Sequence, residues 1–180
     1  MRTPDFDFIV VGSGAAGAAA AARLAEGGAQ TLLLEQGGKV EPQKDGTAAV
    51  ALYYANSGLT AALGNGLFPI AVGRGLGGTT AINSGTCLRP PREALLRWQG
   101  KVPGFDAERF SERVEEAWSA LKVKTVPRRF CGGSADLFLK GLDRLGIPGG
   151  HLLDRAEEGC EASGRCCFVC PRDAKMTSAR

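Results

Sequence analysis

A glycine-rich turn between a strand and a helix constrains this sequence more than any other feature. The apolar run Phe6–Val11 leads directly into Gly12–Gly17, which has the spacing G-x-G-x-x-G. Strong helix formers occupy residues 15–25, and a second apolar run, Thr31–Glu35, ends on an acid. A nearly continuous apolar run is typical of a parallel strand covered on both faces. The order strand, glycine turn, helix, strand predicts a βαβ unit.

Each position of the turn suits a dinucleotide. Gly12 permits the tight turn, Gly14 allows the backbone to approach a pyrophosphate, and Gly17 allows helix and strand to pack closely. The amino end of the helix offers N–H groups and a partial positive charge to phosphate. Glu35 is placed to accept a hydrogen bond from a ribose hydroxyl, which disfavours a 2′-phosphate and hence NADP. The motif by itself leaves FAD and NAD open.

Composition excludes several other classes of protein. The 180 residues are 44% hydrophobic and 23% charged, which is ordinary globular usage. The net charge of +3 is too small to argue for nucleic acid as a partner. No apolar run approaches the roughly 18 residues of a membrane span, and the amino terminus does not resemble a signal peptide. We therefore expect a cytoplasmic protein, in a compartment that favours thiols or metal ligands over disulfides for the six cysteines.

A second glycine cluster follows at Gly73–Thr80. Its glycines are interrupted only by an arginine and a leucine, and two threonines end it. Such a run exposes backbone N–H groups to an anion or a polar ring. It excludes a packed helix up to Gly78, whereas Thr79–Ile82 is suited to begin one. The amino end of that helix would then point at a ligand.

Together, Gly12–Gly17 and Gly73–Asn83 resemble the glucose-methanol-choline (GMC) oxidoreductases. The second segment matches that family's first signature throughout. The resemblance implies an α/β fold with a Rossmann-like βαβ FAD-binding domain that is incomplete in this chain. It also implies FAD as cofactor and oxidation of a small-molecule alcohol with hydride transfer to the flavin. The matching residues of the signature are Gly73, Arg74, Leu76, Gly77, Gly78, Thr79, Thr80, Ile82 and Asn83.

The same resemblance implies particular cofactor contacts. Ala15 and Ala16 match backbone contacts to the FAD phosphates, and Thr79 matches a small hydroxyl residue near the pyrophosphate. Some members attach FAD covalently through a histidine at the position of Ile82, and a hydrocarbon cannot form that bond, so we expect noncovalent FAD. The expected cofactor-binding residues are Gly12, Gly14, Ala15, Ala16, Gly17, Glu35, Gly78, Thr79, Asn83, Ser84 and Thr86, of which Asn83, Ser84 and Thr86 match the stretch beside the isoalloxazine ring.

The remaining sequence predicts elements of lower specificity. Residues 39–50 are polar and predict a loop, and Gly64–Gly66 predicts a turn. Asp106 is suited to cap a helix, and Ser134 another. The expected strands are 51–54 and 68–72, and the expected helices are 92–98, 107–121 and 134–145.

Four cysteines crowd into Cys160–Cys170, and Cys167 and Cys170 have C-x-x-C spacing. Three interpretations remain open: thiolates that hold zinc or an iron–sulfur cluster, an ordered loop that packs beside the flavin domain, and a disulfide. His151 is the only histidine and matches no motif, so we interpret it as a surface residue.

The functional prediction is an FAD-dependent alcohol oxidoreductase of which this chain is an amino-terminal fragment. We divide it into an FAD-binding core, 1–100, and a helical, cysteine-containing part, 101–180. The GMC catalytic base lies in the carboxyl-terminal part of that family, so we expect no catalytic residue here and no alcohol turnover by these residues alone. The alternatives are an electron-transfer module with a metal site at Cys160–Cys170 and an NAD-dependent reductase, which would leave Gly73–Asn83 unexplained.

Overall fold

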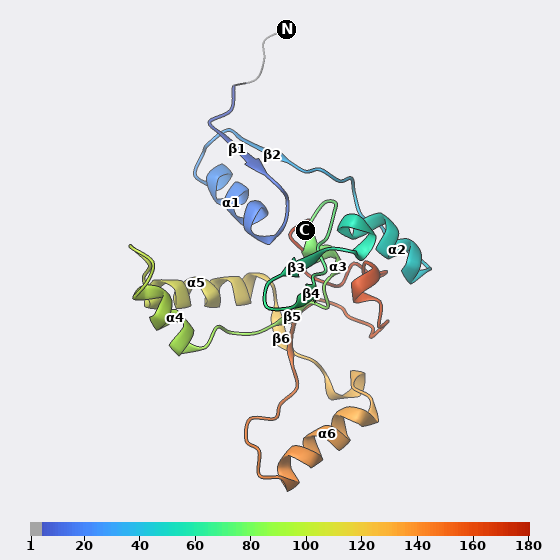
Figure 1. Cartoon of the computed structure of the whole chain (residues 1–180). Coiled ribbons are helices and arrows are strands. Elements are labelled where there is room, and N and C mark those ends of the chain that lie inside the picture. The colour runs from blue at the N-terminus through green and yellow to red at the C-terminus, as the bar shows by residue number, and fades with distance from the viewer. Residues whose placement is uncertain (1–4) are drawn as a thin grey trace. The chain divides into compact units, whose positions relative to one another are not determined.

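The predicted βαβ unit forms at the amino terminus. A computed structural model describes residues 5–180. Strand β1 (Phe8–Val11) pairs in parallel with β2 (Thr31–Leu34). Helix α1 (Ala15–Glu26) joins them and lies along the strand pair in Figure 1. The helix ends at Gly27, whose N–H bonds to the Arg23 carbonyl at 3.1 Å. The predicted order of strand, glycine turn, helix and strand is therefore confirmed.

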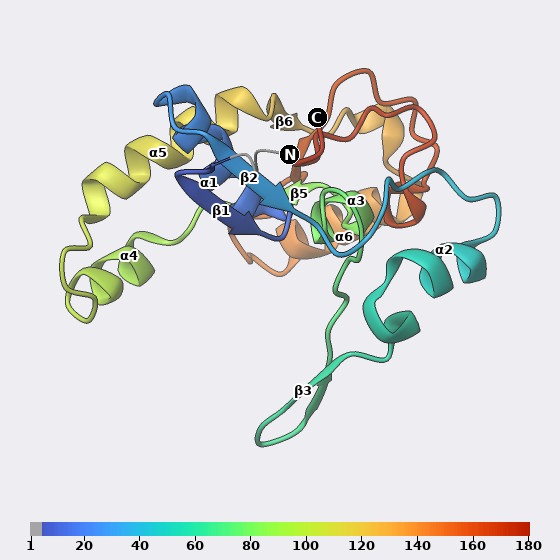
Figure 2. The same ribbon diagram turned by 90° about the horizontal axis from the view of Figure 1, so that it is seen from above.

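The burial of these strands differs from the prediction. The first strand was expected to be covered on both faces, but Phe8 and Ile9 are exposed and Val11 is 82% exposed. Leu34 at the end of the second strand is exposed as well. The sheet has two strands, and α1 lies on one side of it (Figure 2). A single helix buries one face of a strand pair, so the other face keeps its apolar side chains in solvent.

The described chain forms two compact units. The first unit runs to Ser84 and resumes at Gly159–Arg180, and the second unit is Gly85–Glu158. This division differs from the boundary we placed between residues 100 and 101. The difference arises because the cysteine segment forms hydrogen bonds with residues before Ser84. For example, Tyr54 Oη donates to the Cys167 carbonyl at 2.9 Å.

A helix replaces a loop and a strand in the middle of the first unit. Residues 39–50 were predicted as a loop and 51–54 as a strand, but α2 spans Gly46–Tyr53. Asp45 caps it, because its carboxylate accepts bonds from the N–H groups of Thr47 and Ala48 at 3.0 and 3.3 Å. Satisfied amino-terminal N–H groups and an alanine-rich interior favour helix over strand.

A hairpin and a short helix complete the first unit. The predicted turn Gly64–Gly66 joins β3 (Ala61–Leu63) to β4 (Leu67–Pro69), and Figure 2 shows this hairpin extending away from α2. The predicted strand 68–72 is shorter than expected, because β3 offers only three residues for pairing. Thr79–Ile82 forms helix α3, as predicted. The unit also contains the 3₁₀ helices η1 (Ala55–Gly58) and η3 (Cys166–Phe168).

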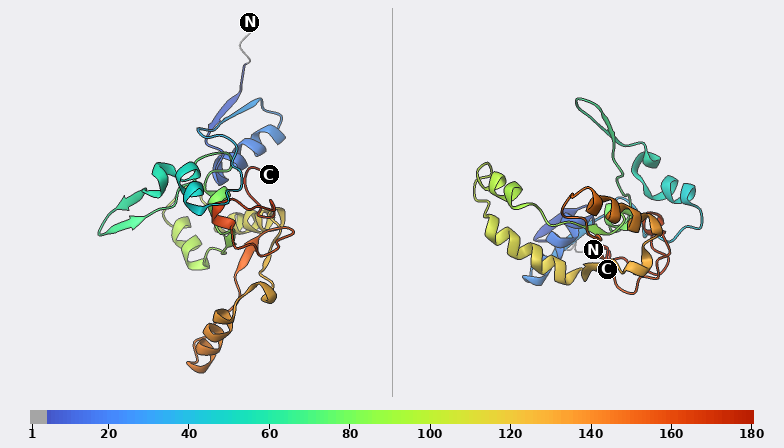
Figure 3. Two further views of the ribbon diagram at one scale, coloured as in Figure 1. Left: turned by 90° about the vertical axis from the view of Figure 1, so that its right-hand side faces the viewer. Right: turned by 90° about the horizontal axis from the view of Figure 1, so that it is seen from below.

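The second unit consists of a small sheet with helices. Its antiparallel strands lie in the order β5 (Thr86–Cys87), β7 (Asp154–Ala156), β6 (Val123–Thr125). Figure 3 shows α6 in orange, away from α4 and α5 in its left panel. Ser134 does not cap α6, because that helix begins one residue earlier, after Gly132, and has no side-chain cap. The other elements are α4 (Arg92–Gln99), α5 (Ala107–Ala120), η2 (Arg128–Phe130) and α6 (Gly133–Arg144).

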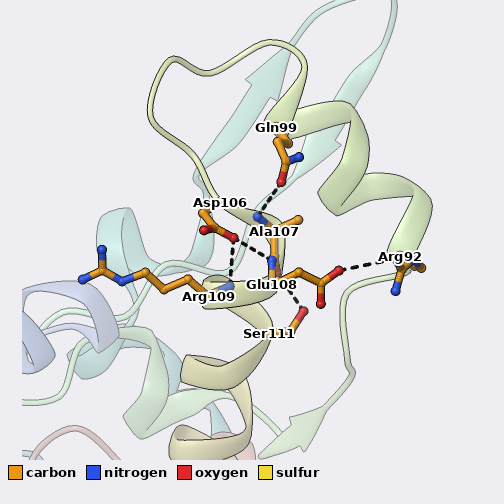
Figure 4. Close-up of polar contacts among 7 residues, drawn as sticks. All are labelled: Arg92, Gln99, Asp106, Ala107, Glu108, Arg109 and Ser111. Carbon is orange, nitrogen blue, oxygen red and sulfur yellow. Dashed lines mark hydrogen bonds and ion pairs between the residues drawn. The ribbon is translucent and has the colours of Figure 1, made fainter.

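The predicted cap of α5 is present and supports a first quantitative expectation. The Asp106 carboxylate accepts bonds from the N–H groups of Glu108 and Arg109, both at 3.0 Å (Figure 4). Asp106→Ala should lower the free energy of unfolding by about 1 kcal/mol, the usual cost of a lost amino-terminal cap. Chemical denaturation measures the change, and Asp106→Asn, which keeps an acceptor, serves as control. Equal losses in both variants would contradict the capping role.

None of the helices within residues 5–180 combines the length and apolar character needed to cross a bilayer.

Candidate functional site

Ser13 and Glu35 join the ends of the first two strands. Ser13 lies inside the glycine turn and is fully buried. Both its backbone N–H and its hydroxyl donate to Glu35 Oε2, at 2.8 and 2.7 Å. The Gly37 N–H donates to the other carboxylate oxygen, Oε1, at 3.0 Å. Glu35 therefore fastens the glycine turn after β1 to the turn after β2.

This environment stabilises the charged form of Glu35. Its pKa falls from 4.5 to about 2, chiefly because the Ser13 N–H donates to the carboxylate. The N–H of Gly37 and the hydroxyl of Ser13 act in the same direction, and burial opposes them. Hydrogen bonds to an ionised acceptor favour ionisation. The carboxylate is thus charged at any pH near neutrality.

The two glycine motifs lie in direct contact with each other. Gly77 N–H donates to Ser13 Oγ at 3.0 Å, which links the second motif to the first. A Cβ placed on Gly78 would lie 3.0 Å from the Cα of Gly14. A Cβ on Gly37 would lie 2.6 Å from Gly75. Only residues without side chains allow such approaches. The structure therefore brings together the two segments that the sequence singled out separately.

A residue far along the chain completes this junction, and sequence reasoning missed it. Ser178 Oγ donates to the Ser13 carbonyl at 2.9 Å, and Ser178 N–H donates to Thr80 Oγ1 at 3.0 Å. Thr80 Oγ1 in turn donates to the Gly77 carbonyl at 2.6 Å. No motif or periodicity distinguishes Ser178, since its role depends on contacts across 98 and 165 positions.

The amino end of α1 has the properties of a phosphate cradle. Gly14 is its N-cap residue and supplies no side-chain bond, and Ala15 and Ala16 are exposed at the first turn. A Cβ added at Gly14 would meet no atom within 4 Å, so the space beside the backbone is open. Unpaired N–H groups at the amino end of a twelve-residue helix attract an anion. These residues fit the phosphates of a dinucleotide.

Thr79, Asn83 and Ser84 lie in or directly after α3. The Thr79 hydroxyl accepts a bond from Gly73 N–H at 3.0 Å and thereby closes the second glycine loop. Ile82 is buried, whereas Asn83 and Ser84 are exposed immediately after the helix. Thr86 belongs to the second unit, where it lies in β5 opposite Arg155.

The cysteine segment behaves as a packing element of the first unit. The Phe168 ring lies against Gly46 at the start of α2, where an added Cβ would be 2.9 Å from Phe168 Cζ. All six cysteines are free thiols. Across residues 5–180, no group of three or more Cys, His, Asp or Glu side chains is placed to hold a metal ion.

His151 is exposed in a loop of the second unit, as the sequence analysis expected. Its Nδ1 lies 2.7 Å from the Gly149 carbonyl.

Comparisons with known proteins identify the family to which the chain is similar. The family model described as GMC oxidoreductase matches residues 6–180. An uncharacterized GMC-type oxidoreductase of Mycobacterium tuberculosis (strain ATCC 25618 / H37Rv) is 35% identical over 177 residues, which are 94% of this chain and 28% of the relative. A long-chain-alcohol oxidase of Arabidopsis thaliana is 27% identical over 180 residues, covering 97% of this chain and 24% of the relative.

Among solved structures, a variant of the formate oxidase of Aspergillus oryzae RIB40 superimposes with a TM-score of 0.38 and 26% identity. The match covers 52% of this chain and 18% of that one. The chain thus spans about a quarter of the length of the curated relatives it matches. The match of the family model over nearly all described residues and the two joined glycine motifs lead to one conclusion: this chain belongs to the GMC oxidoreductases and carries their amino-terminal FAD-binding domain.

Proposed function

We propose that this chain forms the FAD-binding part of an enzyme that oxidises the CH–OH group of a small-molecule alcohol. The observation that carries the proposal is the junction of the two glycine motifs beside the open amino end of α1. Relatives named long-chain-alcohol oxidases support the alcohol as substrate class. FAD supplies the hydride-accepting N5 atom when it is bound.

Different described residues are proposed to bind different parts of FAD. The open N–H groups of Ala15 and Ala16, with Gly14 leaving room beside them, suit the phosphates. Glu35 is proposed as the acceptor of a ribose hydroxyl, beside the donors Ser13, Gly37 and Gly75 that stabilise its charge. Gly12 and Gly17 form the turn itself. Gly78 and Thr79 are proposed for the pyrophosphate, and Asn83, Ser84 and Thr86 for the flavin ring.

No described residue is assigned to removal of the alcohol proton. His151 lies in the second unit and is held by its contact with the Gly149 carbonyl. A general base must reach the hydroxyl within hydrogen-bonding distance, and nothing within residues 5–180 points to His151 for that role. We therefore propose that the described residues bind and orient the cofactor.

The attachment of FAD supports a direct test. Ile82 occupies the position where some relatives of the family carry a linking histidine, and its side chain is a buried hydrocarbon. Denaturation of the full-length protein should release all flavin into the filtrate, where absorbance and chromatography identify it as FAD. The denatured polypeptide, examined by mass spectrometry, is the matched sample. Flavin that stays on the polypeptide would contradict noncovalent binding.

The substrate class is tested by anaerobic mixing of the full-length enzyme with alcohols of several chain lengths. We expect loss of the oxidised flavin band, and slower loss with an alcohol deuterated at the carbinol carbon. Dithionite reduction shows that the flavin is reducible. A flavin that dithionite and NADH reduce but no alcohol does would overturn the proposed function.

We also propose a reducing compartment, such as the cytoplasm, for this protein. Support comes from the interpretation of the six cysteines as thiols or ligands, which such a compartment favours.

A further inference from the structure

Lys175 is a buried lysine whose amine is surrounded by backbone carbonyls. The residue is 2% exposed. Its Nζ donates to the carbonyls of Ala81, Asn83 and Cys166, at 2.7, 2.8 and 2.9 Å. An ammonium has three N–H donors, and each of them has an acceptor here. The three carbonyls come from two segments separated by more than 80 positions in the sequence, so this lysine is a junction in the first unit.

Two of the three carbonyls belong to the carboxyl end of α3. The last carbonyls of a helix have no partners within the helix, and a lysine amine is a suitable donor to them. Helix α3 has only four residues, which is too short to be stable by its own hydrogen bonds. Its geometry must therefore come from contacts with the rest of the unit.

One carboxyl-terminal segment holds α3 on both sides. Ser178 bonds to Thr80 in the first turn, and Lys175 bonds to Ala81 and Asn83 at the end. The amino side of α3 is Gly78, which lies against Gly14, and its carboxyl side continues into Asn83 and Ser84. A displacement of the helix would thus move the stretch proposed for the flavin ring relative to the phosphate cradle.

The third carbonyl accepting from Lys175 belongs to the cysteine segment, Cys160–Cys170. Cys166 accepts from Lys175 through its backbone, and the next residue, Cys167, accepts from Tyr54 Oη through its backbone. Phe168 packs on Gly46. The segment therefore connects α2 to the lysine through carbonyls and a ring.

We propose that Lys175 is a positioning residue for the flavin: its ammonium fixes the backbone of Asn83, and the cysteine segment provides the third acceptor that keeps the ammonium in place. A buried cation is costly unless every donor is paired, so the three carbonyls are held to a narrow set of positions. The proposal rests on the proposed function for the identity of the cofactor. The coupling of Lys175 to α3 does not depend on that identity.

The test compares Lys175→Met with Lys39→Met in the full-length protein. Methionine keeps the length of the lysine stem but removes the charge and the donors. Lys39 is an exposed lysine that lines the same cavity of about 480 Å³ as Lys175, so Lys39→Met is a matched control. We expect Lys175→Met to raise the FAD dissociation constant at least tenfold and to shift the visible flavin bands. Lys39→Met should keep the wild-type values.

A second readout uses the apoprotein. Hydrogen exchange at the Asn83 N–H, which bonds to the Thr79 carbonyl at 2.9 Å, should accelerate at least tenfold in Lys175→Met and stay unchanged in Lys39→Met. Faster exchange in a protein that binds no FAD would overturn the proposed function and leave the lysine junction standing. Wild-type affinity, spectrum and exchange in Lys175→Met would overturn the junction.

If Lys175→Met does not fold, Lys175→Arg carries the test. A guanidinium keeps the charge but directs its donors in a planar fork, so it cannot reproduce three contacts converging on one nitrogen. Folded Lys175→Arg should then bind FAD with shifted visible bands. Wild-type band positions in that variant would overturn the positioning role.

Discussion

Gly14→Ala should leave the fold intact and weaken FAD binding by at least about a hundredfold, whereas Gly17→Ala should strongly lower the stability of the first unit. A Cβ at Gly14 meets no atom within 4 Å, and its φ of −65° suits alanine. The methyl group would occupy the space proposed for phosphate. The loss of two hydrogen bonds to a charged ligand, at ~1.5–3 kcal/mol each, accounts for that factor.

Gly17→Ala differs because its Cβ would lie 2.0 Å from the Gly12 carbonyl oxygen and 3.1 Å from the carbonyl carbon. Backbone atoms of a tight turn cannot move aside as a side chain does, so the cost should be about 3 kcal/mol or more. Thermal unfolding of the apoproteins and titration with FAD measure the two effects. Gly64→Ala, at the hairpin tip with open space around it, is the control. Equal FAD affinities in Gly14→Ala and Gly64→Ala would contradict the cradle.

Glu35→Ala should lower both stability and FAD affinity. The Glu35 pKa of about 2, against 4.5 for an ordinary carboxyl, corresponds to about 3 kcal/mol at ~1.4 kcal/mol per unit. Partial solvent exposure reduces this to about 2 kcal/mol. Loss of the ribose acceptor, with the Ser13 and Gly37 donors left without a partner, should weaken FAD binding by roughly ten- to a hundredfold.

The pH dependence identifies Glu35 as the source of the stability difference. A carboxyl whose pKa is lowered by folding stabilises the folded state above its unfolded pKa, here about 4.5. The difference in unfolding free energy between wild type and Glu35→Ala should be constant above pH 5 and should decrease as pH falls from 4.5 towards 2. Denaturant titrations at several pH values measure it. Glu26→Ala, which removes an exposed partner of Arg23, should change stability by less than about 0.5 kcal/mol. A pH-independent difference for Glu35→Ala would contradict the charged role of the carboxylate.

Glu35→Gln distinguishes the proposed role of Glu35 in ribose binding from its role in hydrogen bonds within the protein. The amide has one acceptor oxygen, whereas the carboxylate oxygens face donors on both sides, Ser13 on Oε2 and Gly37 on Oε1. One donor would therefore face the amide NH₂ group. Glu35→Gln should thus lose most of the stability that Glu35→Ala loses, while it retains an oxygen for the ribose.

Elements with a strong local signal could be predicted from the sequence. The glycine spacing determines α1 and the parallel strands around it, because only this turn allows helix and strand to pack closely. Asp106 determines the start of α5 through its own carboxylate. Helix α2 was missed although Asp45 caps it in the same way, because the polar residues before it were interpreted as a loop.

The sequence by itself determined the family resemblance, the phosphate turn and the chemical types of the site residues, because each depends on neighbouring positions along the chain. Only the tertiary structure decided that Ser13 and Gly77 join the two glycine motifs, that Ser178 and Lys175 hold α3, and that the cysteine segment contributes backbone carbonyls. Those contacts link residues 64 to 98 positions apart in most cases. A hydrogen bond between distant segments depends on how the whole unit packs, and such packing leaves no local pattern in the sequence.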